Sequence, residues 1–128
     1  MKIATPAVPL SLLLLAAGCG GGGDAESAAS ARERAADLAR QDKLDEAAAG
    51  FREAIELDPT NAVSYDGLGR VLAQKGDTVE AIRNFRKAVE LDPDYASAYE
   101  GLAHTLAAVG MDDEAREALA KYEQLQGR

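Results

Sequence analysis

Apolar residues recur at helical spacing along most of the chain. In the middle of the sequence, Val71 and Leu72 follow Leu68 by three and four positions, which places all three on one face of an α-helix. A second stripe with the same spacing comprises Ala81, Ile82, Phe85, Ala88 and Val89. We therefore predict pairs of amphipathic helices, about six helices of roughly 10 to 14 residues, with the first over about residues 27–40.

Glycine and proline punctuate this pattern. Gly76 and Gly110 suit the left-handed turn that ends the first helix of a pair. Pro59 and Pro93 disfavour helical backbone at the residue before them and so close each pair. An acidic residue stands in the expected first turn of each second helix, where the positive end of the helix dipole favours it: Glu46, Glu80 and Glu114.

The helix pairs repeat with a period of 34 residues. Shifting the sequence by 34 aligns residues 51–59 with 85–93, identical at seven of nine positions, and 62–76 with 96–110, identical at seven of fifteen. Such a period indicates stacked units that share one core, because a single helix pair cannot bury its apolar face alone.

This pattern resembles the tetratricopeptide repeat (TPR), in which aromatic, Leu-Gly, Ala, Phe and Pro positions recur at set spacings. The residues that carry the resemblance are Ala47, Phe51 and Pro59, then Tyr65, Leu68, Gly69, Leu72, Ala81, Phe85 and Pro93, then Tyr99, Leu102, Ala103, Leu106, Ala115 and Leu119. The resemblance implies an all-α fold, a right-handed α-solenoid of three repeats. The repeats would span residues 28–61, 62–95 and 96–128.

The N-terminal residues have the layout of a secretory signal peptide. Lys2 provides a positive start, and residues 7–18 are apolar apart from Pro9 and Ser11, a run too short to span a bilayer. The order Leu-Ala-Ala-Gly-Cys that ends at Cys19 resembles the lipobox of bacterial lipoproteins. Residues 1–18 would then be a lipoprotein signal peptide, and Cys19 would carry the lipid. The alternative is an ordinary cleavage site beside a stray thiol.

Residues 19–27, rich in Gly, Ala and Ser, are expected to form a flexible tether of about 16 Å. The lipoprotein resemblance implies a bacterial cell-envelope protein. Gly20 after the cysteine favours the outer membrane, facing the periplasm, over the inner membrane.

The charge balance limits the possible partners. The chain has 128 residues, of which 22 are acidic and 14 basic, for a net charge of −8. Such a chain is a poor match for phosphate backbones or anionic lipid surfaces, so we expect no nucleic-acid partner and membrane contact through the lipid anchor only. One Cys and one His exclude an internal disulfide and the usual multi-ligand zinc sites. No nucleophile pattern or phosphate loop is present, so we expect no enzyme, metal or cofactor.

In this family, peptides usually lie in a groove lined by the first helix of each repeat. The 34-residue register assigns that groove to Glu33, Arg40, Val63, Gly67, Arg70, Gln74, Ser97, Gly101 and His104, with Ala29, Ala36 and Ala108. The positions that clamp a peptide carboxylate in some relatives hold Ala29, Glu33, Gly67, Ser97 and Gly101, an acid and no base. We therefore expect no carboxylate clamp. The small residues predict a groove left open for a closely approaching helix or strand.

Two groove residues have an acid one helical turn earlier. Asp66 precedes Arg70, and Glu100 precedes His104, each by four positions. Arg70 and His104 could contact a bound segment, and replacing both with Glu should then weaken binding without changing stability. The alternative is ordinary pairing on a solvated helix face, which contributes about 0.2 to 0.5 kcal/mol per pair.

The last predicted helix carries Leu119, Tyr122 and Leu125 on one side. Tyr122 could fold over this side by itself. Alternatively, the three residues form a docking edge for a second copy, giving a homodimer, or for another subunit.

These features predict a membrane-anchored TPR lipoprotein that binds a protein or peptide without catalysing a reaction. We expect an accessory or assembly factor for a cell-envelope complex. The alternatives are a structural subunit of a permanent oligomer, assembled through the C-terminal edge, and an unanchored secreted TPR adaptor.

Overall fold

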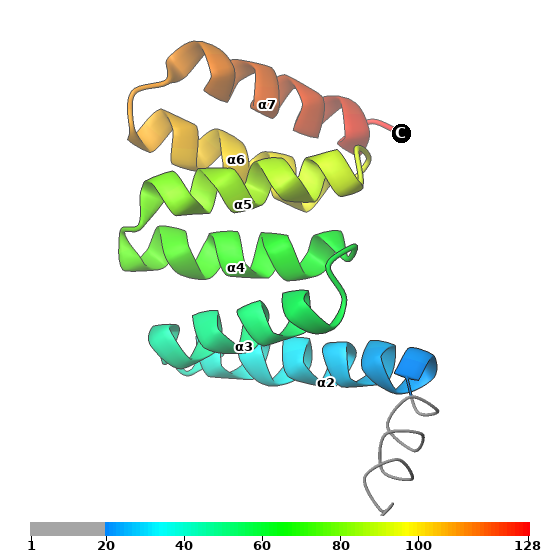
Figure 1. Ribbon diagram of the computed structural model, residues 1–128. Coiled ribbons are helices and arrows are strands. Elements are labelled where there is room, and N and C mark those ends of the chain that lie inside the picture. The colour runs from blue at the N-terminus through cyan, green and yellow to red at the C-terminus, as the bar shows by residue number, and fades with distance from the viewer. Residues whose placement is uncertain (1–19) are drawn as a thin grey trace, which may run out of the picture.

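The structure, a computed structural model, describes residues 20–128, which form six α-helices and no strand (Figure 1). The helices are α2 (Gly20–Arg40), α3 (Leu44–Leu57), α4 (Ala62–Lys75), α5 (Thr78–Leu91), α6 (Ala96–Ala108) and α7 (Asp112–Gln126). Their pairing as α2/α3, α4/α5 and α6/α7 confirms the predicted all-α TPR architecture. None of the described helices is both long enough and apolar enough to cross a membrane.

Prolines end the second helix of the first two pairs, as predicted. α3 ends at Leu57, and Asp58 before Pro59 is extended, with φ −144°. α5 likewise ends at Leu91, one residue before an extended Asp92. The residue before a proline avoids helical backbone because the proline ring would clash with it, so each helix stops at the same place in its repeat.

Left-handed residues end the first helix of every pair. Gly76 has φ 89° and Gly110 has φ 80°, which confirms their predicted role. Asp42, 34 residues before Gly76, adopts the same conformation with φ 62°. The next amide after Gly76, that of Asp77, donates to the carbonyl of Leu72 at 2.8 Å. The chain can therefore reverse direction tightly while the last carbonyls of the helix remain hydrogen-bonded.

The helices form two layers. Besides the contacts along the chain, α4 contacts α6 and α2 contacts α4, whereas the second helices α3, α5 and α7 lie farther apart. The first helices therefore form the inner layer of the stack, and the second helices form the outer layer. Figure 1 shows the pairs stacked in chain order. The core between the layers is built around Phe51, Leu72, Phe85 and Leu106.

An ion pair repeats on the outer layer with the period of the sequence. Arg52 of α3 pairs with Glu80 of α5 at 3.1 Å, and Arg86 of α5 pairs with Glu114 of α7 at 2.6 Å. Both pairs are solvent-exposed, so each contributes at most about 1 kcal/mol. Glu80 and Glu114, two of the three acids predicted to compensate the helix dipole, thus also bridge neighbouring repeats.

The N-terminal helix is longer than predicted. α2 begins at Gly20, so residues 20–27 are helical and the expected flexible tether is wrong for them. No proline interrupts residues 20–40, and each residue that extends an existing helix adds a backbone hydrogen bond, which offsets the coil preference of glycine. Cys19 and the predicted signal peptide, residues 1–18, lie outside the described residues.

Alanines, rather than larger side chains, attach α2 to the stack. Ala28, Ala31 and Ala35 are buried, while the charged side chains of residues 32–40 are exposed or half-buried. A Cβ on Gly50 of α3 would come within 2.9 Å of the Ala35 Cβ. The two helices therefore approach closely, and a small residue is required on both.

Candidate functional site

The inner layer contains a hollow of about 500 Å³ between α2 and α4. We call it the α2–α4 hollow. Six of the nine predicted groove residues line it: Glu33, Arg40, Val63, Gly67, Arg70 and Gln74. The remaining three, Ser97, Gly101 and His104, belong to α6 and lie elsewhere. The predicted groove is therefore concentrated in the first two repeats.

Phe51 forms part of the floor of this hollow and explains one of its small residues. Its ring lies so close to Gly67 that a Cβ there would overlap the ring. The contact recurs 34 residues later, where a Cβ on Gly101 would lie 2.5 Å from the ring of Phe85. The expectation that these glycines leave space for a ligand is wrong. Each accommodates the phenylalanine of the preceding repeat.

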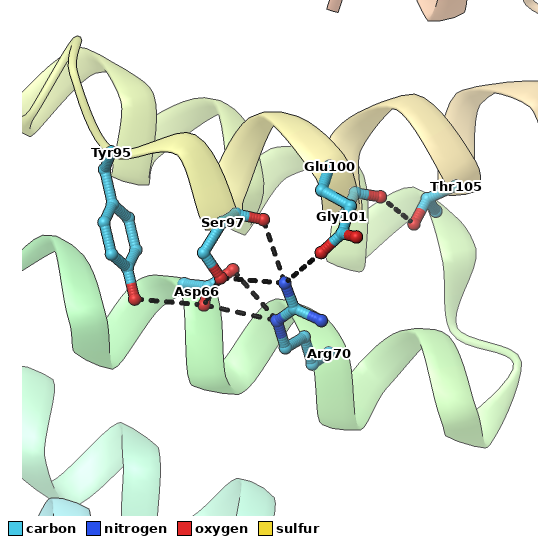
Figure 2. A network of polar contacts seen from close by, with 7 residues as sticks. All are labelled: Asp66, Arg70, Tyr95, Ser97, Glu100, Gly101 and Thr105. Carbon is cyan, nitrogen blue, oxygen red and sulfur yellow. Dashed lines mark hydrogen bonds and ion pairs between the residues drawn. The ribbon is translucent and has the colours of Figure 1, made fainter. Parts of the chain in front are cut away.

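The next seam of the inner layer, between α4 and α6, is closed by polar contacts centred on Asp66 (Figure 2). The Asp66 carboxylate is buried and accepts hydrogen bonds from the Ser97 hydroxyl at 3.0 Å, the Tyr95 hydroxyl at 3.3 Å and Arg70 Nε at 3.3 Å. With Glu100 these residues form what we call the Asp66 network. These donors satisfy the hydrogen-bonding capacity of a carboxylate that has little access to water.

Arg70 spans the same seam. Its Nη2 donates to the Ser97 carbonyl at 2.9 Å, to the Ser97 hydroxyl at 2.8 Å and to Glu100 at 3.4 Å. Burial alone would lower the pKa of Arg70. The carboxylates of Asp66 and Glu100 outweigh burial, so the pKa of Arg70 lies above its ordinary value. The predicted pairing of Asp66 with Arg70 is confirmed, but Asp66 is buried, and the pair connects two repeats instead of lying on a solvated face.

The 34-residue register explains why one seam is open and the other is closed. The residues 34 positions before Asp66, Arg70, Tyr95 and Ser97 are Arg32, Ala36, Asn61 and Val63. With alanine in the place of the arginine and valine in the place of the serine, the first seam cannot form the network. The space that the Arg70 side chain fills between α4 and α6 remains empty beside Ala36.

The open seam is apolar within and charged at its rim. Val63 is 42% exposed, and Phe51 and Val71 are buried beneath it. Arg32 and Arg40 also line the hollow. The positions compared with a carboxylate clamp do offer an acid and no base, but these arginines bring positive charge from other positions. The groove therefore contains the predicted Arg40 together with Arg32, which the register did not assign to it.

His104 lies in a different hollow, of about 380 Å³, which it shares with Leu119 of the predicted docking edge. Leu119 is 40% exposed, whereas Tyr122 and Leu125 are half-buried. Within residues 20–128, His104 forms no ion pair with Glu100, because that carboxylate turns to Arg70 instead. The predicted pairing at this position is therefore wrong.

Sequence reasoning missed five contributors to the α2–α4 hollow: Arg32, Ala39, Phe51, Asp66 and Val71. Arg32 could have been found, since it occupies the register position of Asp66. Phe51 and Val71 look like ordinary core residues in the sequence. Nothing in the pattern shows that one side of the Phe51 ring and of the Val71 side chain faces a groove. In the part of the chain described here, no group of three or more His, Cys, Asp or Glu side chains could hold a metal ion.

Comparisons with known proteins agree with the repeat pattern and the fold. Models of the TPR repeat and of the tetratricopeptide repeat match residues 69–110 and 51–83, respectively. A search of curated proteins finds no match.

Solved TPR domains superimpose closely on the chain. The second TPR of Spaghetti (RPAP3), bound to an HSP90 peptide, has a TM-score of 0.78 at 19% identity, over 80% of this chain and 95% of that one. The TPR2B domain of yeast Sti1, in a complex with pHsp70, has a TM-score of 0.77 at 27% identity, over 78% of this chain and 80% of that one. The Arabidopsis OM64 TPR domain has a TM-score of 0.79 at 18% identity, over 82% and 87%. The chain therefore carries tetratricopeptide repeats and has the all-α TPR fold.

Proposed function

We propose that this protein is a membrane-anchored TPR lipoprotein whose α2–α4 hollow binds a segment of another protein. The observation that carries the proposal is the hollow itself, which opens at the one inner seam where the polar network is replaced by Ala36 and Val63. Support also comes from the similar domains of Spaghetti and Sti1, which were solved with an HSP90 peptide and with pHsp70, respectively.

The chemistry of the hollow suits a polypeptide. Its volume of about 500 Å³ lies in the usual range of binding pockets, and its apolar floor can bury one or two side chains. The rim residues Arg32, Glu33 and Arg40 provide charges of both signs for the backbone and polar side chains of the same segment. No Ser, Cys, His or Lys lines the hollow, and we assign it binding without catalysis or a cofactor.

The anchor is the second part of the proposal. Lipidation of Cys19 would hold the repeats on a bacterial envelope membrane, with the outer membrane favoured by Gly20. A protein-binding module fixed there suits an accessory or assembly factor for an envelope complex. Labelling with radioactive palmitate tests this part. We expect label in the native protein and none in the Cys19→Ala variant, whereas an unlabelled native protein would support the secreted adaptor instead.

Photocrosslinking from the membrane-bound protein tests the hollow. A photoreactive amino acid replaces Val63, inside the hollow, or Ala49, an exposed residue of α3 outside it. We expect a defined protein adduct from position 63 alone, identified by mass spectrometry. Ala36→Arg should suppress that adduct by filling the hollow, whereas the matched change Ala49→Arg should leave it. Equal adducts from both positions, or an adduct insensitive to Ala36→Arg, would reject the site.

The alternative of a permanent oligomer rests on the 40% exposure of Leu119. An obligate assembly has no stable free subunit, so dilution distinguishes it from a binding module. A folded monomer at submicromolar concentration would exclude the permanent oligomer and leave the binding module in place.

A further inference from the structure

The outer layer contains a second hollow, which lies on the exposed face of α5 beside the turn from α6 to α7. Its volume is about 770 Å³, and its lining includes Val79, Arg83, Arg86, Val109 and Met111. We call it the α5 hollow. It shares no lining residue with the α2–α4 hollow, and the proposed function makes no use of it.

Exposed apolar side chains gather in the α5 hollow. Among residues 27–128, five large hydrophobic side chains are exposed, and three of them line it: Val79 at 71%, Val109 at 43% and Met111 at 38%. Val79 belongs to the first turn of α5 and the other two to the following repeat, so the cluster is built by two helix pairs. An apolar cluster set in a hollow and rimmed by polar residues is typical of a binding surface.

The rim of the α5 hollow is basic on a chain with a net charge of −8. Arg83, Arg86 and Lys87 surround the apolar cluster, against one acid, Glu90, in the lining. Arg86 and Lys87 have partners of their own at 2.6 and 3.4 Å. Arg83 forms no ion pair with any residue of 27–128, although it stands in the sequence between the exposed Val79 and the other two cations. Its charge is available to a ligand.

We propose that the α5 hollow is a second docking site, which takes an acidic amphipathic segment of another protein. Aliphatic side chains of that segment cover Val79 and Met111, and a carboxylate on its flank pairs with Arg83. Charge complementarity selects this ligand, because the rim presents Arg83, Arg86 and Lys87 against a single acid. A helix presenting leucines on one face and glutamates beside them has the required chemistry.

The experiment uses a fluorescein-labelled synthetic helix with leucines on one face and flanking glutamates, and a control peptide in which each glutamate is lysine. Fluorescence anisotropy measures binding to the full chain, and amide chemical shifts locate it. We expect saturable binding of the acidic peptide, with shifts in α5 and around Met111, and at least about tenfold weaker binding of the basic peptide.

Matched variants separate the two hollows. Val79→Glu and Arg83→Glu should each weaken the acidic peptide about tenfold. Val63→Glu and Arg32→Glu make the same changes in the α2–α4 hollow and should leave that affinity unchanged. All four positions are at or near the surface, so circular dichroism should show an unaltered fold.

Several results would overturn the inference. The acidic peptide could fail to saturate, or the acidic and basic peptides could bind equally well. The acidic peptide could also lose affinity only in the Val63→Glu and Arg32→Glu variants. Vesicles with anionic lipid provide a further comparison. Tighter binding to these vesicles than to the peptide, abolished by Arg83→Glu, would assign the α5 hollow to a membrane surface instead.

Discussion

The two inner seams of this protein occupy equivalent places in successive repeats and serve different purposes. Between α4 and α6, the Asp66 network fills the seam with hydrogen bonds and an ion pair. Between α2 and α4, Ala36 and Val63 stand at two of the equivalent positions, and a hollow of about 500 Å³ remains. A repeat protein can thus create a binding surface by omitting contacts that hold its neighbouring repeats together.

What the two seams share is as informative as their difference. In both, a phenylalanine from the outer layer packs against a glycine of the next inner helix. This apolar contact sets the spacing of the helices, so the polar residues are free to vary. We infer that the Phe and Gly pair maintains the stack, while the polar positions decide whether a seam is open.

The largest effect is expected where the shared contact is broken. Gly101→Leu would force a side chain into the ring of Phe85 and should destabilise the chain by about 3 kcal/mol. Urea unfolding followed by circular dichroism measures it. Ala107→Leu, an exposed position on the same helix, is the control and should change stability by less than about 0.5 kcal/mol. A Gly101→Leu protein as stable as this control would show that the ring contact does not set the helix spacing.

Removing the centre of the network should have the next largest effect. Asp66→Ala leaves Tyr95, Ser97 and Arg70 without their shared acceptor, and we expect a loss of about 2 kcal/mol. Arg32→Ala, at the equivalent place in the open seam, should cost less than about 0.5 kcal/mol. Similar losses in the two variants, measured by thermal or urea unfolding, would contradict the difference between the seams.

Tyr95 makes the closed seam sensitive to alkali. Burial first, and the Asp66 carboxylate second, raise the pKa of Tyr95 above its ordinary value of 10.0. The stability that the buried, neutral Tyr95 phenol contributes is fully present below pH 10.0, the ordinary pKa. It is lost as the pH rises through the raised pKa of the folded protein. Tyr95→Phe should cost about 1 kcal/mol at neutral pH and reduce this alkaline loss.

The control for alkaline sensitivity is Tyr122→Phe, on α7 and away from the Asp66 network. Melting temperatures measured across the alkaline range should follow the native curve in this variant. If Tyr95→Phe shows the same alkaline decline as the native protein, the sensitivity belongs elsewhere in the fold.

The smallest change in stability is expected when the network is transplanted. Arg32→Asp, Ala36→Arg and Val63→Ser together reproduce Asp66, Arg70 and Ser97 of the closed seam in the open one. We expect a gain of about 0.5 kcal/mol from the new hydrogen bonds, and loss of photocrosslinking from the hollow. For this measurement the photoreactive residue replaces Gln74, which also lines the hollow. If the triple variant still crosslinks to its partner from position 74, the polar residues of the seam do not decide whether it binds.

The helix boundaries were predictable because they depend on neighbours in the chain. Pro59 acts on the residue before it, and Gly76 permits a left-handed turn wherever it stands. The exception is the start of α2, where a run of glycines suggested coil although the helix extends through it. Composition is a weak guide to the length of a helix when packing stabilises its other end.

The groove was predictable only in part, because it depends on contacts between repeats. Register alone placed Val63, Gly67 and Arg70 on the inner layer, and the structure agrees. Register could not show that the ring of Phe51, 16 positions earlier, packs against Gly67, or that the Arg70 side chain turns toward Ser97. The direction of a long side chain is decided by the partners it finds, and these come from another repeat.

The sequence by itself therefore determined the repeat, its period and the ends of nearly every helix, since these follow from local backbone preference and the spacing of apolar residues. Only the tertiary structure decided that one seam closes around Asp66 and the other opens beside Ala36. The reason is that a buried carboxylate requires hydrogen-bond donors, whereas an alanine requires none. Which donors lie close enough to such a carboxylate depends on how neighbouring repeats stack.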